Sequence, residues 1–258
     1  MARTWLLKQA LAEQQLIFGL FCSTPQPQMV EMIGVAGFDF VIIDTEHTLI
    51  NPETLEQMLR AADAAGIAAL VRVPDASPKP ILRALDAGAQ GVVVPSVRSR
   101  AEAEAIVRAS RYAPQGERSL NAGRSAAFGA LDLAAHLQQA NDEVVVVAMI
   151  EDRAGVAAID EILAVPGIDM VLEGAADLSQ SLGVAWQTRH PEVRSALIGV
   201  QSAAQARGVP FCAIPRAVED LGAWQACGVR AFVLGDERGI AFRALQAQLE
   251  RFKQEVKE

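Results

Sequence analysis

Lysine is scarce in this chain of 258 residues, and its few positions exclude one kind of chemistry. The lysines are Lys8, Lys79, Lys253 and Lys257, and none of them ends a stretch that resembles a buried strand. A Schiff-base lyase or a pyridoxal phosphate enzyme needs an amine that projects into its site. We therefore expect no Schiff-base lysine and no pyridoxal phosphate.

Cysteine and excess positive charge are lacking as well. Cys22, Cys212 and Cys227 show no metal-binding spacing, and their odd number argues against a disulfide framework. The formal net charge of -8 makes nucleic acid and anionic membranes poor partners. No signal peptide is apparent, and no apolar run reaches the roughly 20 residues that span a bilayer. These features predict a globular, cytoplasmic protein that acts on small molecules.

Motifs for nucleotide binding and for serine nucleophiles are absent. No G-x-G-x-x-G follows the first apolar run, and neither G-x-x-x-x-G-K-[ST] nor a G-x-S-x-G elbow occurs. The missing nucleotide motifs argue against a doubly wound open sheet, the alternative to the barrel described next. The missing elbow argues against a Ser-His-Asp hydrolase.

Apolar runs alternate with amphipathic stretches along the whole chain. Eight runs are typical of strands buried on both faces: Ile17–Cys22, Phe38–Asp44, Ala68–Pro74, Gly91–Val97, Val144–Glu151, Met170–Ala175, Pro210–Pro215 and Ala231–Asp236. Strand–helix alternation with short connections implies right-handed parallel crossovers. The pattern predicts an α/β fold, a (β/α)8 TIM barrel that forms a single domain over residues 1–258. A C-terminal helix is expected at 239–257.

The longest connection between candidate strands covers residues 112–142. It contains Arg118 and Arg124, and its part Leu131–Gln139 has a helical pattern. Long segments that follow barrel strands lie over the active-site mouth. We therefore expect residues 112–142 to form a lid or a substrate-binding loop.

Titratable side chains gather where the candidate strands end. They are Asp44, Glu46 and His47 after the second strand, Arg72 in the third, Glu151 at the end of the fifth, and Glu173 and Asp177 at or after the end of the sixth. An ionised group in an apolar strand is expensive to bury unless it is paired, so each of these positions needs a physical reason. In α/β barrels the carboxyl ends of the strands form the site.

Carboxylates on neighbouring strand ends, with little Cys or His nearby, describe an all-oxygen metal site. Such a site suits Mg²⁺ or Mn²⁺. Arg72 would supply a fixed cation for an anionic substrate, and His47 would move protons near neutral pH.

Structural roles are the alternative for several of these side chains. Glu151 and Arg72 could form a buried ion pair across the barrel, and Asp44 could cap a loop or orient His47. Glu173 could be solvated or could pair with an arginine. Two further histidines, His136 and His190, are expected at the surface.

Taken together, these residues are similar to those of a known family, the HpcH/HpaI aldolases, also called class II pyruvate aldolases. The similarity extends from about Phe18 to Phe252. Its segments, in order, are Ala36-Gly37-Phe38-Asp39-Phe40, Ile43-Asp44-Thr45-Glu46-His47, Val71-Arg72, Val94-Pro95, Ile150-Glu151, Pro166-Gly167-Ile168-Asp169 and Gly174-Ala175-Ala176-Asp177-Leu178-Ser179.

The resemblance implies a metal-dependent enzyme on a (β/α)8 barrel, commonly a hexamer that exchanges its last helix between subunits. By match to the family motifs, Glu151 and Asp177 would ligate the divalent metal. His47, held by Asp44, would be the acid/base.

The remaining implied roles concern the substrate, a 2-oxo acid such as pyruvate or oxaloacetate. Arg72 would neutralise its carboxylate and the enolate oxygen that the metal also stabilises. The backbone at Gly174, Ala175 and Ala176 would receive the carboxylate. The implied activity is that of a carbon–carbon bond lyase or synthase.

The chain departs from the common family pattern around the expected mouth. Gly174-Ala175 replaces a usual Gly-Pro, Glu173 stands where an apolar residue is typical, and Met149 replaces a glutamine. The usual Arg-Gly loop reads Arg118–Arg124. A branch with similar departures comprises the citrate synthases of staphyloferrin B-type siderophore pathways, which join oxaloacetate with acetyl-CoA.

In that branch Arg72, Arg118 and Arg124 would help to hold a dicarboxylate and a tricarboxylate product. An aldolase reaction is the first expectation, and citrate synthesis with acetyl-CoA is the alternative. A second alternative is a non-catalytic barrel that binds a metabolite.

Overall fold

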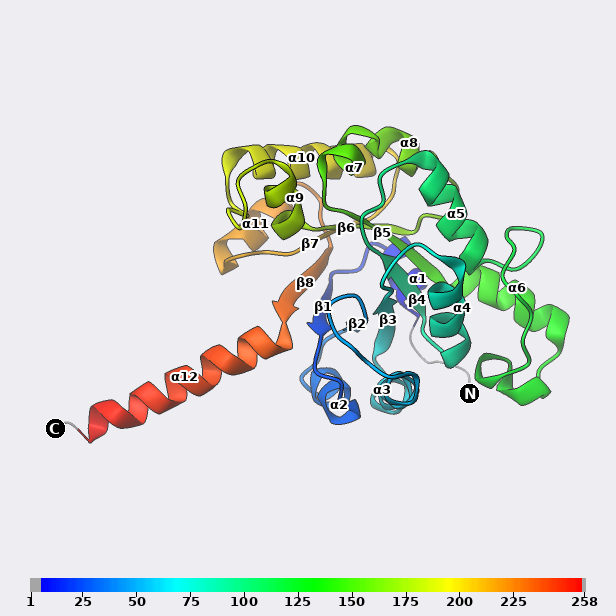
Figure 1. The fold of residues 1–258 in the computed structure, drawn as a ribbon, viewed down its shortest axis with the longest axis horizontal. Helices are drawn as coiled ribbons and strands as arrows, with labels where there is room; N and C mark the ends of the chain where they lie inside the picture. Colours follow the sequence, from blue (N-terminus) through cyan, green and yellow to red (C-terminus); the bar gives the residue numbers. More distant parts are fainter. Residues whose placement is uncertain (1–5, 257–258) are drawn as a thin grey trace.

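A computed structural model describes residues 6–256 of the chain. Its strands close into a parallel barrel, in which each strand pairs with the next along the chain and β8 pairs with β1 (Figure 1). The strands are β1 (Ile17–Cys22), β2 (Phe40–Asp44), β3 (Ala68–Arg72), β4 (Gly91–Val94), β5 (Val145–Ile150), β6 (Met170–Glu173), β7 (Phe211–Ala213) and β8 (Ala231–Asp236). The predicted single-domain (β/α)8 barrel is confirmed.

Helices alternate with the strands, and most of them cover the outside of the barrel, whereas the first packs against its interior cluster and the last extends away from it (Figure 1). They are α1 (Leu7–Ala12), α2 (Pro27–Val35), α3 (Pro52–Ala65), α4 (Pro78–Ala87), α5 (Arg100–Ser110), the 3-10 helix η1 (Arg124–Gly129), α6 (Leu133–Glu143), α7 (Arg153–Ala157), α8 (Ile159–Leu163), α9 (Ala175–Ser181), α10 (Pro191–Ala206), α11 (Val218–Ala226) and α12 (Glu237–Glu255). No helix in residues 6–256 is long and apolar enough to cross a membrane.

Local sequence signals explain where the helices begin and end. In α3 the Asn51 side chain accepts a hydrogen bond from the Thr54 amide at 2.8 Å, and Pro52 occupies the first turn, where its missing N–H costs nothing. Gly66 then ends the helix with a left-handed φ of 72°, a conformation that glycine adopts without strain. The following strand can therefore start almost at once.

Alternation along each strand decides which side chains reach the barrel interior. In β2, Phe40 and Ile42 pack in the interior cluster, whereas Val41 and Ile43 pack against the helices. Because successive side chains point to opposite faces, Asp44 continues the interior set. The same parity sends Arg72 and Glu151 inward at the ends of β3 and β5.

Several observed strands end earlier than predicted. β3 ends at Arg72 rather than at Pro74, and β7 ends at Ala213 rather than at Pro215. Proline cannot donate to the strand ladder, so hydrogen bonding stops before it. β4 ends at Val94 rather than at Val97, and Ser96 has a left-handed φ of 52°.

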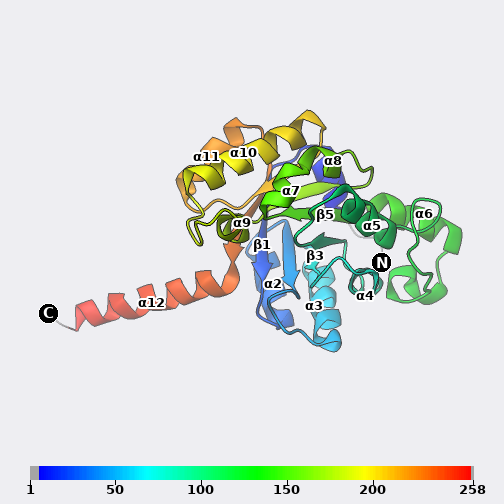
Figure 2. The same cartoon turned by 45° about the horizontal axis from the view of Figure 1, so that its top comes forward.

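The C-terminal helix α12 projects away from the barrel instead of packing on it (Figures 1 and 2). It was predicted at 239–257 and is observed at Glu237–Glu255; residue 257 lies outside the described residues. Phe242, Leu245, Leu249 and Phe252 on α12 are all exposed. A helix with such an apolar stripe normally buries it against another element.

The segment 112–142 lies at the opposite end of the barrel from the mouth. It follows helix α5, not a strand, so the chain has already returned to the amino ends of the strands when the segment begins. Residues of this segment line a cavity together with Ile67, Gln90 and Val144, which immediately precede β3, β4 and β5. The prediction of a lid over the mouth is therefore wrong within this chain.

Candidate active site

Arg72 is the central cation at the carboxyl end of the barrel. Its Nε and Nη2 donate to the two carboxylate oxygens of Asp44 at 2.9 and 2.7 Å, a bidentate pair that is almost fully buried. The guanidinium also lies 4.6 Å from the centre of the Phe21 ring. Its Nη1 is 3.9 Å from the sulfur of Met149. The arginine is thus held in one orientation before any substrate arrives.

Asp44 serves Arg72 and the backbone of the next turn, not the His47 ring. Its Oδ1 accepts the amide N–H of Glu46 at 3.1 Å and that of His47 at 3.3 Å. Burial alone would raise the pKa of Asp44, but the hydrogen bonds and charge of Arg72 outweigh it and hold this pKa below its ordinary value. The expectation that Asp44 caps a loop is confirmed, and Asp44 contacts His47 through the backbone amide of this residue, not through its ring.

The His47 imidazole stands at the open side of this cluster. Its side chain is 59% exposed, and its Nε2 is 3.7 Å from Oε2 of Glu46. A ring with this freedom can meet a substrate or a water molecule at the mouth.

Glu46 connects His47 to Arg72. Its Oε2 lies 3.2 Å from Nη1 of Arg72, so Arg72 faces two carboxylates at once. Burial raises the pKa of Glu46, and the negative charges of Asp44 and Asp177 act in the same direction. The sequence placed Glu46 beside this site but assigned it no role; its position two residues after Asp44 was the available signal.

Glu151 is buried at the end of β5 and faces Ser96, not Arg72. Its Oε1 accepts hydrogen bonds from the amide and the hydroxyl of Ser96 at 2.7 and 3.0 Å. Burial raises the pKa of Glu151, and the carboxylates of Glu46 and Asp177 raise it further. The alternative of a buried Glu151–Arg72 pair is therefore wrong. Ser96 was missed by the sequence reasoning because a serine after a strand carries no specific signal.

The turn between β6 and α9 lies directly against Glu151. A Cβ placed on Gly174 would lie 2.5 Å from Oε2 of Glu151, so the carboxylate requires glycine at this position. Asp177 follows in the first turn of α9, close enough for its charge to act on both Glu151 and Glu46. Ala175 is buried beside it.

These carboxylates fit a divalent metal. Three acidic groups share one rim, the pKa values of two of them are raised, and every side chain donor is an oxygen. In residues 6–256 no group of three or more His, Cys, Asp or Glu side chains is arranged to hold a metal ion. Glu151 and Asp177 would supply two ligands, and substrate and water would have to supply the others, as is common for Mg²⁺.

Glu173 lies one residue before this turn but faces the other way. β6 alternation places Met170 and Leu172 in the interior cluster, so Glu173 points outward, where it is 2% exposed. It accepts the Ile214 amide N–H at 2.6 Å and lies 3.5 Å from Nη2 of Arg216. Of the two expectations for Glu173, an arginine partner is confirmed and solvation is wrong.

Arg118 and Arg124 are not brought to the mouth by this chain. Arg118 pairs with Asp86 at 2.8 Å and stacks on the Tyr112 ring, and Arg124 pairs with Asp63. Both pairs lie at the amino end of the barrel. His136 is buried in the same region, beside Tyr112, which corrects the expectation that it is a surface residue.

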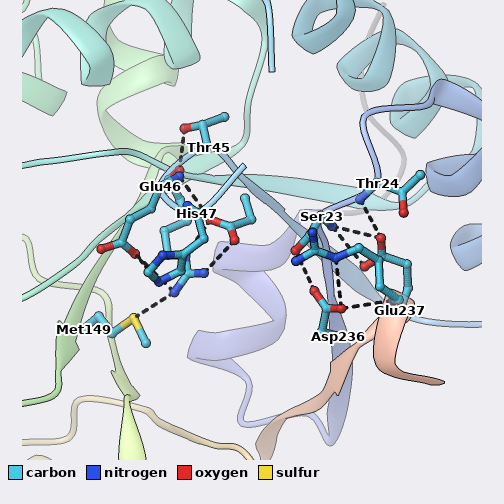
Figure 3. A network of polar contacts seen from close by, with 11 residues as sticks. Ser23, Thr24, Thr45, Glu46, His47, Met149, Asp236 and Glu237 are labelled. Atoms are coloured by element: carbon cyan, nitrogen blue, oxygen red, sulfur yellow. Dashed lines mark hydrogen bonds and ion pairs between the residues drawn. The ribbon is translucent and has the colours of Figure 1, made fainter. Parts of the chain in front are cut away.

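A second polar network occupies the β1–β8 side of the mouth (Figure 3). The buried Glu237 carboxylate accepts the amide N–H groups of Ser23 and Thr24, the latter at 2.6 Å. The Ser23 hydroxyl donates to Asp236 at 2.5 Å, and Asp236 also caps α12. This network, which the sequence reasoning missed, ties the first turn of α12 to the rim.

Comparison with known proteins identifies the family. Residues 17–241 match HpcH/HpaI aldolase/citrate lyase. The chain belongs to this family. The resemblance inferred from the sequence is thereby confirmed, and with it the expectation of an enzyme of the aldolase-like lyase or synthase kind.

Two groups of HpcH/HpaI relatives are informative. The chain is 32% identical over 247 residues to 5-keto-4-deoxy-D-glucarate aldolase of Shigella dysenteriae, covering 95% of this chain and 96% of that protein. It is 47% identical to the solved citrate synthase SbnG, with a TM-score of 0.92 and coverage of 98% and 99%. An HpcH/HpaI aldolase from Desulfitobacterium hafniense has 32% identity, a TM-score of 0.89, and coverage of 98% and 97%.

Proposed function

We propose that this protein is a citrate synthase that condenses oxaloacetate with the acetyl group of acetyl-CoA. The observation that carries the proposal is one rim that holds Arg72, fixed by Asp44, and the Glu151 and Asp177 carboxylates, with Glu46 between them in electrostatic contact with all three. Such a rim can bind a 2-oxo acid and stabilise the charge that develops on it. The 47% identity to citrate synthase SbnG, against 32% to the sugar-acid aldolase, favours condensation over aldol cleavage.

Glu151 and Asp177 would hold Mg²⁺ or Mn²⁺. When bound, the metal would polarise the keto group of the 2-oxo acid. Arg72 would neutralise the substrate carboxylate and the charge that grows on the neighbouring oxygen. The amides of Gly174, Ala175 and Ala176 would receive a carboxylate oxygen.

His47 would transfer the proton in this reaction. Its exposed ring can donate to, or accept from, the oxygen of the reacting partner, directly or through water. Glu46, between His47 and Arg72, would keep the ring near the mouth. Asp44 would hold His47 through its backbone amide, which leaves the ring free for this role.

An aldolase that releases pyruvate from a hydroxy-oxo acid is the second candidate, favoured by the match to 5-keto-4-deoxy-D-glucarate aldolase over 95% of the chain. Both reactions would use the cation of Arg72 and proton transfer by His47. A non-catalytic metabolite-binding barrel is disfavoured, since a binding protein has no need for an exposed histidine beside an acidic metal site.

One assay separates the candidates. The enzyme is incubated with oxaloacetate and acetyl-CoA in the presence of Mg²⁺ or Mn²⁺, and the release of free thiol is followed. We expect turnover that requires both substrates. Release of pyruvate from hydroxy-oxo acids without any thiol release would overturn the citrate synthase and establish the aldolase. No turnover in either assay would support the non-catalytic barrel.

The metal assignment has a separate test that does not depend on activity. Calorimetry with Mn²⁺ should detect binding to the wild type, and Asp177→Ala should abolish it. Asp236→Ala, at the other side of the same mouth, is the matched control and should retain it. Tight binding by Asp177→Ala would contradict the assignment.

We also propose that the protein is a homo-oligomer in which α12 packs on a second copy. Its exposed residues Phe242, Leu245, Leu249 and Phe252 recur every three or four positions, which is the spacing of a helix packing stripe. Because α12 projects outward, Leu234 on the outer face of β8 remains 40% exposed. The helix of a second copy could cover this face. The hexamer implied by the family resemblance and the cytoplasmic location both stay predictions.

Light scattering after size-exclusion chromatography tests the assembly. Leu245→Glu combined with Leu249→Glu should convert the oligomer to smaller species. Gln246→Glu combined with Gln248→Glu adds the same charge beside the stripe and should leave the mass unchanged. A monomeric wild type would contradict the proposal.

A further inference from the structure

A cavity of about 80 Å³ lies outside the barrel, at the same end as the mouth. It is enclosed by α10, α11 and the residues that follow β6 and β7, elements that lie side by side in both ribbon views (Figures 1 and 2). Leu197, Ile214 and Trp224 form apolar walls. The volume admits one small functional group rather than a whole cofactor.

Guanidinium groups dominate the polar lining of this cavity. Arg189, Arg194 and Arg216 all line it, against the carboxylates of Glu173 and Asp220. Such a surplus of positive charge is unusual in a chain of net charge -8. The electrostatic potential of the cavity therefore favours anions.

The two carboxylates hold two of the arginines in place. Asp220 accepts Nη2 of Arg189 at 3.1 Å and the backbone amide of Arg216 at 3.2 Å. The buried Glu173 lies 3.5 Å from Nη2 of Arg216, a distance that leaves the other donors of this arginine free. A buried carboxylate is costly, and orienting Arg216 gives Glu173 a reason to stand where an apolar residue is typical of the family.

Arg194 has no such partner. In residues 6–256 no ion pair or hydrogen bond of its exposed side chain is found. It lies in the first turn of α10 (Pro191–Ala206), the positive end of the helix dipole, where Glu192 of the same turn is the only acidic residue. Thr188, just before the helix, adds a hydroxyl to the same lining. An unpaired arginine at a helix start thus stands beside two oriented ones.

We propose that this cavity is an anion-binding site, distinct from the metal-binding rim, that takes the phosphate or carboxylate group of a small molecule. Guanidinium forks suit both groups, and the apolar walls accept the carbon atoms next to the anion. Glu173 immediately precedes Gly174, the first residue of the turn proposed to receive the substrate carboxylate. Occupation of the cavity therefore alters the substrate affinity of the neighbouring site; this coupling rests on the proposed function.

Binding is tested by calorimetry on the full chain with inorganic phosphate and, separately, with citrate. Arg194→Gln should weaken the binding of the accepted anion at least about tenfold, the loss of one charge-assisted contact. Arg83→Gln, an exposed arginine on α4, is the matched control and should bind as the wild type does. The anion that binds to the wild type shows which group the cavity accepts: phosphate, carboxylate or both.

Two further variants separate the guanidinium fork from charge alone and the cavity from the mouth. Arg216→Lys keeps a charge beside Glu173 but loses the planar fork, so it should fold normally and bind more weakly than the wild type. Arg72→Gln removes the cation of the mouth and should still bind the anion in the cavity. Equal affinities in the wild type and Arg194→Gln, no saturable binding of either anion, or loss of binding in Arg72→Gln would each overturn the proposal.

Coupling to the mouth is measured as the KM for oxaloacetate with and without the bound anion. We expect the anion to change KM in the wild type and not in Arg194→Gln. An equal change in both proteins would overturn the coupling. If the proposed reaction itself fails, no turnover is seen at all, whereas the calorimetric result on anion binding stands unaffected.

Discussion

The two ends of the barrel use charge in opposite ways. At the amino end each buried arginine meets its own carboxylate: Arg111 pairs with Asp169 at 2.7 Å, and Arg118 pairs with Asp86 at 2.8 Å. At the carboxyl end Arg72 faces both Asp44 and Glu46, and no ion pair of Glu151 occurs in residues 6–256. The amino end, where charges are paired, therefore stabilises the fold. The carboxyl end, which we call the acidic end, keeps an excess of negative charge that a cationic ligand can neutralise.

Burial makes the excess of carboxylates at the carboxyl end chemically important. In water several carboxylates at one rim would be ordinary, but here burial raises the pKa of Glu46 and of Glu151. Such groups gain from a divalent cation, because it compensates for the lost hydration of their charged forms and for the repulsion between them. The comparison therefore predicts that substitutions at the carboxyl end impair activity and that those at the amino end impair stability.

The largest expected effect is that of Glu151→Gln. Because this change removes a proposed metal ligand at the acidic end, turnover should fall on the order of 10³-fold or more. The folded protein should persist, since glutamine can still accept the hydrogen bonds of Ser96. Steady-state kinetics over a range of Mn²⁺ concentrations provides the measurement. Asp169→Asn at the other end is the control, and an equal loss of turnover there would remove the distinction between the two ends.

Arg111→Gln should show the opposite pattern. Its guanidinium is 2% exposed and bonds both Asp169 and the Val144 carbonyl; Lys8 remains as a second partner of Asp169, so the change should destabilise the fold by about 2 kcal/mol. Denaturant unfolding measures this loss. The kcat below the new unfolding transition should equal that of the wild type. A variant of normal stability with lost activity would show that the amino end takes part in catalysis.

His47→Ala should reduce turnover on the order of 10²-fold, because a positioned proton-transfer group contributes at least that much. Its side chain is largely exposed, so the free energy of unfolding should not change. The pH dependence of kcat should lose one limb. Unchanged turnover would remove His47 from the proton-transfer role, and His190→Ala, a histidine that caps α10, serves as the control.

The smallest effect expected is a pH dependence of stability that depends on Asp44. The pKa of Asp44 in the folded protein lies below its value in the unfolded chain, which is about 3.9. Its contribution to the free energy of unfolding is therefore complete above that pH and is lost as the pH falls through the folded pKa. Asp44→Asn should therefore be less stable than the wild type at pH 7 by about 1–3 kcal/mol, and the gap should narrow in acid. Unfolding curves at both pH values test this; a gap that widens in acid would contradict the assignment.

Much of the barrel could be predicted because its signals are local. A buried parallel strand must be apolar on both faces, and a helix end must satisfy its free amides, so runs such as Ala231–Asp236 and caps such as Asn51 are visible without any contact. The alternation of side chains along a strand could also have predicted which way the carboxylates at the strand ends point. Counting from Met170 sends Glu173 outward, and counting from Val145 sends Glu151 inward.

Pairing between distant residues could not be predicted in the same way. Whether Arg72 meets Asp44 or Glu151 depends on the register of neighbouring strands, and the pairing of Asp44 with Arg72 across β2 and β3 decides it. Ser96 reaches Glu151 only through a left-handed backbone turn. The assignment of Arg118 and Arg124 to the mouth failed because a family motif carries no information about which end of the barrel it occupies.

The sequence by itself determined the strand and helix order, the family, and the residue types of the site, because periodicity and motifs are properties of neighbouring residues. Only the tertiary structure decided that Asp44 pairs with Arg72 and reaches His47 through the backbone amide, that Glu173 turns outward to Arg216, and that α12 leaves the barrel. Those outcomes depend on which of several available partners lies within a few ångströms, and that depends on strand register and closure of the barrel.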